Sequence, residues 1–197
     1  MSAPARIAVA ILAGGEGSRI GGGKPLIRLG SKTLIEHAFE RAQAWSREIV
    51  VALRSSHQLG GISLPSIIDD PAIEGPLAGL AAALAWGERQ GAEAVLTIPC
   101  DMPLLPDDLP NRLGAALADQ AAVLASSGGR LHPVCGLWRL GALGAMPAYC
   151  ATGRRSLRGF AEQIGFAAVD WPADPADPFF NINSKADLAE AERLIAA

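Results

Sequence analysis

Short runs of consecutive apolar residues recur along the chain, separated by longer segments of mixed polarity. The first run, from Ile7 to Leu12, is wholly apolar and ends at glycines. A strand that is apolar on both faces is typical of a parallel sheet covered on both sides. The runs predict strands at Ile7–Leu12, Glu48–Leu53, Ser66–Ile68, Ala94–Ile98, Ala121–Ala125 and Pro133–Trp138.

Between these runs, apolar residues return with the period of an α-helix. After Thr33 they recur on one face, and Thr33 and Glu36 have the spacing of a capping box, as do Ser184 and Asp187. Helices are predicted from Thr33 onward and at Leu77–Gln90, Leu109–Ala118, Gly141–Tyr149, Ser156–Ile164 and Lys185–Ile195. The alternation predicts an α/β fold, a single-domain Rossmann-like three-layer sandwich with a mostly parallel sheet over residues 1–197.

Composition narrows the class of protein. Half of the 197 residues are apolar and only 19% are charged, which excludes a disordered chain. The net charge of −3 gives no basic excess of the kind that binds nucleic acid, and no apolar run approaches the length of a membrane span. Cys100, Cys135 and Cys150 lie far apart, so neither a disulfide framework nor a zinc site is expected. We therefore expect a soluble, cytoplasmic protein.

The strongest chemical signal is the glycine-rich segment after the first strand. The segment from Leu12 to Pro25 reads LAGGEGSRIGGGKP and carries two cations, Arg19 and Lys24. Glycines let backbone N–H groups approach an anion closely, and the two cations add positive charge to the same loop. The segment predicts a phosphate-binding loop.

Two familiar phosphate loops are excluded by spacing. A P-loop needs glycine where Ser18 stands and Ser or Thr where Pro25 stands. A dinucleotide fingerprint needs Gly or Ala where Ile20 stands. This loop is therefore of another design.

Asp101 follows the predicted strand Ala94–Ile98 and lies between two prolines, Pro99 and Pro103. Ligands of open α/β sheets bind beyond the carboxyl ends of the strands, and Mg²⁺ takes one or two carboxylates together with phosphate oxygens. Asp101 is therefore a candidate magnesium ligand. The alternative is an aspartate that only caps the turn between the prolines.

Several further motifs follow in a fixed order, and together they resemble one family. They are LAGG and GGxKPL in the glycine loop, Gly75–Gly79 (GPLAG), Pro99–Pro103 (PCDMP), His132–Pro133, Gly153–Arg155 (GRR) and Asn181–Ser184 (NINS). This set resembles the molybdenum cofactor guanylyltransferases, within the small nucleotidyltransferases, and covers nearly the whole chain.

The resemblance implies that the enzyme transfers GMP from GTP to the terminal phosphate of molybdopterin, releases pyrophosphate and requires Mg²⁺. It also implies protein partners that insert the cofactor or receive it as molybdoenzymes. The implied catalytic residues are Arg19, Lys24 and Asp101, with Asp101 also binding the metal. The implied GTP-binding residues are Leu12, Ala13, Gly14, Gly15, Lys24, Asp70, Gly75 and Asp101, and those on the molybdopterin side are Arg154, Arg155, Asn181 and Asn183.

Simpler interpretations stay open for five of these positions. Asp70 can end a strand with Pro71, Gly75 can begin a helix, and Asn183 can cap one. Arg154 and its neighbour can form a solvated charge pair.

The chain departs from the family at two places. No Asn follows the strand that ends at Leu53, and Gly23 stands where many members carry Asp before the lysine. We therefore expect guanine to be recognised by backbone groups around Leu12 to Gly14. The alternatives are a related nucleotidyltransferase that uses CTP or another phosphorylated acceptor, and a non-catalytic nucleotide-binding module. The pair Gly14–Gly15 favours the guanylyl branch, since cytidylyl relatives more often resemble Leu-Ala-Ala-Gly.

Overall fold

The computed structural model describes residues 6–14 and 23–196. Within them a seven-stranded sheet has the order β5-β4-β1-β6-β8-β7-β9, and β2 and β3 form a separate small hairpin. The strands are β1 (Ile7–Leu12), β2 (Arg28–Leu29), β3 (Lys32–Thr33), β4 (Ile49–Leu53), β5 (Ser66–Ile68), β6 (Ala94–Pro99), β7 (Ala122–Ser127), β8 (Arg130–Arg139) and β9 (Phe166–Trp171). In the large sheet only β8 runs against its neighbours, so the prediction of a mostly parallel sheet is confirmed.

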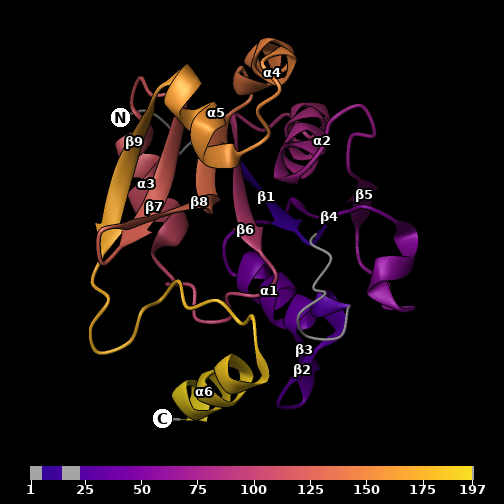
Figure 1. Ribbon diagram of the computed structural model, residues 1–197, viewed down its shortest axis with the longest axis vertical. Coiled ribbons are helices and arrows are strands. Elements are labelled where there is room, and N and C mark those ends of the chain that lie inside the picture. The colour runs from indigo at the N-terminus through magenta and orange to yellow at the C-terminus, as the bar shows by residue number, and fades with distance from the viewer. Residues whose placement is uncertain (1–5, 15–22, 197) are drawn as a thin grey trace.

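Helices cover both faces of this sheet (Figure 1). The α-helices are α1 (Leu34–Gln43), α2 (Pro76–Arg89), α3 (Leu109–Leu117), α4 (Ala142–Ala151), α5 (Leu157–Ile164) and α6 (Lys185–Ala196), and two short 3₁₀ turns are η2 (Lys24–Leu26) and η3 (Ser56–Leu59). Helices α1 and α3 share one hydrophobic core with the sheet, and α2, α4 and α5 share the other. The three-layer α/β sandwich expected from the sequence is therefore present.

Alternation within each strand supplies the two cores. In β1, Val9 and Ile11 pack beneath α1, whereas Ala10 packs beneath α2. Successive side chains of a strand point to opposite faces, so a strand between two helical layers must be apolar at every position. This is why β1 and β4 are continuous apolar runs. In β6 the one polar residue, Thr97, is buried with its hydroxyl bonded to the Gly136 carbonyl and to the Trp138 indole N–H.

Local signals set the start of α1. The Thr33 side chain accepts a hydrogen bond from the Glu36 N–H, and the Glu36 carboxylate accepts one from the Thr33 N–H at 2.7 Å. The predicted capping box is therefore confirmed. The Glu36 carboxylate accepts hydrogen bonds from both the hydroxyl and the N–H of Thr33, and these hold the pKa of Glu36 below its usual value.

Three strands were not predicted from the sequence. The hairpin strands β2 and β3 have two residues each, too short to give a pattern. Strand β9 lies at the edge of the sheet beside β7 and is half-exposed along most of its length, so it lacks a continuous apolar run. The predicted strand Pro133–Trp138 is the inner part of the longer β8.

No helix in the described part of the chain is long and apolar enough to cross a membrane.

Candidate active site

The candidate site lies at the carboxyl ends of the central strands. β1 and β6 are adjacent and parallel, with Leu12 opposite Pro99, so the segments that follow them leave the sheet side by side. The first of these segments includes the glycine loop, and the second carries Asp101. Sheet topology therefore brings Ala13 and Gly14, at the start of the glycine-rich segment, to the same edge of the sheet as Asp101, as the rule for ligand sites in α/β sheets predicts.

Lys24 and Asp101 meet there as an ion pair. Both side chains are largely buried, with 14% and 12% of their surface exposed. Lys24 is the first residue of η2, whose second position is Pro25, and Pro favours this place because its φ is already helical. The lysine ammonium also donates to Asn183 Oδ1 at 2.9 Å and to Asn181 Oδ1 at 3.5 Å. Lys24, Asp101, Asn181 and Asn183 thus form one polar cluster, named here the lysine cluster.

The two asparagines reach this cluster on a crossing segment, residues 172–184, which connects β9 to α6. Near its end, the Ile182 N–H donates to the carbonyl of Asp101 at 3.0 Å. In its middle, Asp177 accepts a hydrogen bond from Ser127 Oγ, and the Phe179 ring stacks on His132 with a centroid separation of 4.6 Å. These anchors fix the segment across the edge of the sheet.

His132 is a part of this anchor. Its Nε2 lies 2.8 Å from Ser127 Oγ. Burial lowers the pKa of His132, while the nearby Asp177 carboxylate acts to raise it. The packing supports a positioning role for this histidine.

Asn183 does not cap α6. The side chain that caps this helix is Ser184, which accepts a hydrogen bond from the Asp187 N–H at 3.1 Å, as the spacing predicts. The Asp187 carboxylate in turn accepts the Asn183 N–H at 2.9 Å. The amide of Asn183 is therefore directed to Lys24, and the simpler interpretation of this residue is wrong.

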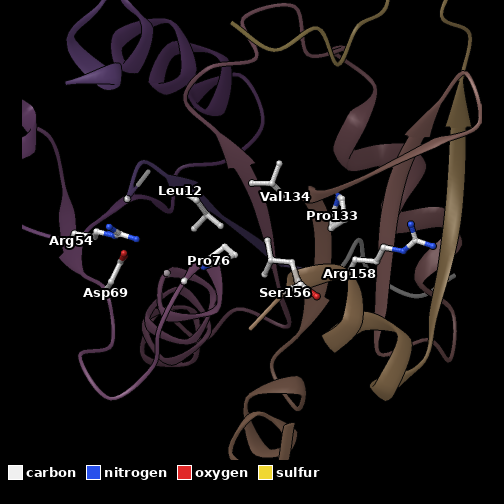
Figure 2. A pocket seen from close by; sticks show the side chains of 12 residues that line it. Leu12, Arg54, Asp69, Pro76, Pro133, Val134, Ser156 and Arg158 are labelled. Atoms are coloured by element: carbon white, nitrogen blue, oxygen red, sulfur yellow. The ribbon is translucent and has the colours of Figure 1, made fainter. Parts of the chain in front are cut away.

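A cavity of about 460 Å³ opens beside the end of β1 (Figure 2). Arg54 and Asp69 lie together at one end of it, Leu12 and Pro76 in the middle, and residues of β8 and α5 at the other end. Its lining comprises Leu12, Gly14, Arg54, Asp69, Gly75, Pro76, Gly79, Pro133, Val134, Ser156, Leu157 and Arg158. The predicted GTP-binding residues Leu12, Gly14 and Gly75 therefore line one cavity.

Gly75 precedes α2 with a φ of 70°, a conformation that favours glycine. Ala13 lies differently, because its side chain is buried in the core beneath α1. Its N–H donates to the Ala52 carbonyl at 3.0 Å, and its own carbonyl accepts from Gln58 Nε2 at 3.2 Å. These two hydrogen bonds therefore hold the backbone in place between Leu12 and Gly14, which line the cavity.

Asp69 lines this cavity, whereas the family resemblance implies Asp70 as the nucleotide-binding residue. The Asp70 carboxylate accepts the Ala72 N–H at 2.9 Å, which is a local turn contact. Asp70 also lines a second hollow, of about 590 Å³, which shares Arg54, Asp69 and Gly75 with the first cavity. Asp69 Oδ1 is buried without a hydrogen-bond partner among the described residues. Burial raises the pKa of the Asp69 carboxyl, and the charge of Arg54 acts in the opposite direction. Of the two aspartates, only Asp69 lines the cavity beside the end of β1.

Arg154 and Arg155 are held by α4 and its surroundings. The guanidinium of Arg155 donates to the carbonyls of Cys150 and Arg154, each at 2.8 Å. Arg154 is exposed and lies over the ring of Tyr149. Neither arginine lines the cavity beside the end of β1, whereas Arg158 of α5 does.

Gly15 and Arg19 lie outside the described residues. Among the residues that are described, no group of three or more His, Cys, Asp or Glu side chains could hold a metal ion. Asp101 still suits a divalent cation, because its Oδ1 is buried without a hydrogen-bond partner in the described structure. Mg²⁺ needs only one or two carboxylates when phosphates supply the other ligands.

Cys100, beside Asp101, is no candidate nucleophile. Burial raises the pKa of its thiol to about 12. A thiol is reactive as the thiolate, so this cysteine stays inert near neutral pH.

Comparison with known proteins points to one group. The family model of the MobA-like NTP transferase domain matches residues 9–169. A molybdenum cofactor guanylyltransferase of Cereibacter sphaeroides is 38% identical, over 94% of this chain and 95% of its own. One of Rhodopseudomonas palustris is 40% identical, over 97% of this chain and 94% of its own. The crystal structure of molybdopterin-guanine dinucleotide biosynthesis protein A from Archaeoglobus fulgidus has the same fold, with a TM-score of 0.78 and 24% identity over 96% of this chain and 98% of that one.

Proposed function

The chain belongs to the MobA-like NTP transferase family, and on this premise we propose that it transfers GMP from GTP to the terminal phosphate of molybdopterin. Pyrophosphate leaves, and the product is molybdopterin guanine dinucleotide. The relatives that match nearly the whole chain carry the name of this activity. The structural observation that carries the proposal is the lysine cluster at the carboxyl ends of β1 and β6, because it gathers a cation and a carboxylate where a nucleotide's phosphates would lie.

The candidate site residues have two tasks, which are to neutralise the negative charge of the substrates and to position them. The acceptor phosphate is already a nucleophile, so the protein's task is to bring two anions together and to neutralise them. Lys24 is one such cation, and Arg19 of the glycine loop is the second. Asn181 and Asn183 hold the Lys24 ammonium from the side of the acceptor. Leu12, Gly14, Gly75 and Asp70 border the nucleotide.

Separation of the Lys24–Asp101 ion pair on substrate binding would make the Asp101 carboxylate available to a metal ion. Without substrate the two charges neutralise each other. Phosphate groups that attract Lys24 would release the Asp101 carboxylate to bind a divalent cation. Family members generally need such a cation, and we propose that here it is Mg²⁺ held by Asp101. When bound, the ion would offset the negative charge that develops on the departing pyrophosphate.

We place the second substrate at the end of the cavity away from Asp69. The end of the cavity away from Asp69 is lined by Pro133, Val134, Ser156 and Arg158. Arg154 and Arg155 lie in the loop between α4 and α5, directly before Ser156. They would add positive charge for the pterin phosphate. We place the enzyme in the cytoplasm, with cofactor-inserting proteins or molybdoenzymes as partners that take its product.

Pyrophosphate release tests the proposal. The purified protein is given GTP, CTP, ATP or UTP, with and without molybdopterin, and with Mg²⁺ or a chelator. We expect release only with GTP, molybdopterin and Mg²⁺ together, and a dinucleotide product of the matching mass. Release with CTP and not GTP would favour the cytidylyl alternative. Nucleotide binding without any release would indicate a non-catalytic module.

A further inference from the structure

The crossing segment, which connects β9 to α6 in Figure 1, turns at Asp177 before it reaches the lysine cluster. The Asp177 carbonyl accepts the Phe180 N–H at 3.1 Å, and its side-chain Oδ1 accepts the Phe179 N–H at 2.9 Å. The same Oδ1 accepts the Ser127 hydroxyl at 2.8 Å. One carboxylate oxygen therefore closes the turn and also ties it to the end of β7.

The Ser127 hydroxyl links this carboxylate to the start of β8. Ser127 and His132 lie on neighbouring strands, and His132 Nε2 is 2.8 Å from Ser127 Oγ. A hydroxyl has one proton, and a carboxylate accepts hydrogen bonds but donates none. The Ser127 proton is therefore directed to Asp177, and His132 Nε2 carries the hydrogen that Ser127 accepts. The order of donation runs from His132 to Ser127 to Asp177.

This order is not that of a catalytic triad. In a triad the histidine accepts the proton of the serine, whereas here His132 donates to Ser127. Ser127 is also buried, with 2% of its surface exposed, and it does not line the cavity beside the end of β1. The three side chains therefore hold the crossing segment in place rather than attack a substrate.

The ring of Phe179 is a second attachment of the same turn. It is buried, it stacks on His132, and it meets Trp171 at the end of β9 edge to face, with the ring centroids 5.4 Å apart. Residues 177–179 are therefore attached to β7, β8 and β9 together.

The two asparagines of the lysine cluster follow this attachment closely. Between them, Ile182 is fully buried in a small separate core with Leu29 of the β2–β3 hairpin and Ala191 of α6. Both asparagine side-chain oxygens face the Lys24 ammonium. Their place beside Lys24 therefore depends on where the chain is attached before them, at residues 177–179, as well as on Ile182.

We propose that Ser127 and Asp177 are positioning residues, whose hydrogen bond seats the crossing segment so that its two asparagines hold Lys24. This inference rests on the proposed function, in which the asparagines hold the ammonium from the side of the acceptor. Pro133, which follows His132, lines the end of the cavity assigned to that substrate. Loss of the hydrogen bond should therefore impair the use of molybdopterin and leave GTP binding almost unchanged.

Amide hydrogen exchange of the full chain tests the seating without any substrate. The Ile182 N–H, which donates to the Asp101 carbonyl, reports whether the end of the segment is in place. In Ser127→Ala this amide should exchange about 10-fold faster than in the wild type, while amides of β1 keep their rates. An acceleration that β1 shares would indicate general destabilisation and would count against the inference.

Ser126→Ala is the matched control. It removes the same hydroxyl from the neighbouring position of β7, but the Ser126 hydroxyl bonds to β9, at Val169 and Asp170. This variant should keep the wild-type exchange rate at Ile182 and the wild-type activity. Equal effects of the two serine variants would remove any special role of Ser127.

Steady-state kinetics test the consequence for the reaction. Because a small misplacement of positioned groups can lower a rate by about a hundred-fold, Ser127→Ala and Asp177→Ala should lower kcat/KM for molybdopterin by about 10- to 100-fold. The Kd for GTP, measured by calorimetry, should change by less than about threefold. Asp177→Asn should restore most of the activity, because its amide oxygen can still accept from Ser127 and from the Phe179 N–H. An Asn variant as impaired as the Ala variant would contradict the proposed hydrogen bond.

A double variant identifies the route by which Ser127 acts. If it acts through the asparagines, Ser127→Ala should cost little further activity in a protein that already carries Asn181→Ala and Asn183→Ala. Losses that multiply in full would show that Ser127 affects the reaction by another route, and the inference would be wrong.

Failure of the inference can be told from failure of the proposed function. If the wild type makes the dinucleotide and Ser127→Ala keeps its kcat/KM for molybdopterin, the function stands and the positioning role is wrong. If the wild type releases no pyrophosphate with GTP and molybdopterin, the proposed function is wrong, and the exchange rate at Ile182 still decides whether Ser127 seats the segment. An unchanged exchange rate at Ile182 in Ser127→Ala would overturn the inference in either case.

Discussion

Removing Lys24 should destabilise the substrate-free protein, and removing Asp101 as well should restore part of the loss. The two side chains form an ion pair with only 14% and 12% of their surfaces exposed. In Lys24→Met the Asp101 carboxylate would stay buried with no cation beside it. Breaking a buried pair in this way costs about 3–5 kcal/mol, and we expect about 3 kcal/mol because Asp101 keeps some contact with water.

The reverse change should cost less. In Asp101→Asn the Lys24 ammonium keeps the side-chain oxygens of Asn181 and Asn183, so we expect a loss of about 1.5 kcal/mol. If the pair interacts, the double variant should lose about 1.5 kcal/mol rather than the sum of about 4.5 kcal/mol. The difference, about 3 kcal/mol, is the coupling free energy of the pair.

Urea unfolding of the wild type, both single variants and the double variant measures this coupling. In thermal unfolding, Lys24→Met should lower Tm by about 6–12 °C, given about 2–4 °C per kcal/mol for a protein of this size. All three variants should lose nucleotidyl transfer, including the double variant whose stability partly recovers. Losses that simply add would refute the reasoning, since they would show that the two charges do not interact in the folded protein.

Three further outcomes follow from the structure. Lys24→Ala should lower kcat for pyrophosphate release by about a hundred- to a thousand-fold, as loss of a preorganised cation does, and wild-type turnover in this variant would remove Lys24 from the mechanism. Burial lowers the pKa of His132 below its ordinary 6.5, so in the window between the two values the unfolded chain binds a proton that the folded chain does not. The free energy of unfolding should therefore fall as pH drops through that window, and less so in His132→Gln; equal pH profiles in urea unfolding would contradict this. With the pKa of Cys100 raised to about 12, iodoacetamide should modify that thiol only in the unfolded protein, and mass spectrometry that finds rapid labelling of native Cys100 would show the thiol to be accessible.

The sequence was sufficient for the elements whose signals are local. The strand Ile7–Leu12 is recognisable because both faces of a central strand must be apolar, and the start of α1 because Thr33 and Glu36 bond to each other's backbone within one turn. The first pattern reflects burial of the strand on both faces, and the second reflects an interaction between residues three positions apart. Strand β9 has no such signal, because at the edge of the sheet its side chains are half-exposed and its pairing with β7 decides its conformation.

The sequence also placed Lys24 and Asp101 in one region, because the carboxyl ends of adjacent parallel strands meet at one edge of a sheet. It could not show that these two side chains pair directly, or that the side-chain oxygen of Asn183 accepts a hydrogen bond from a lysine 159 residues away. It also gave no reason to prefer Asp69 over Asp70. The end of β5 distinguishes the two residues. The Asp69 N–H continues the sheet by donating to the Leu53 carbonyl at 2.8 Å, whereas the Asp70 side chain accepts a hydrogen bond within a turn. Contacts of this kind depend on the three-dimensional meeting of distant segments, and only tertiary structure determines which side chain each segment presents.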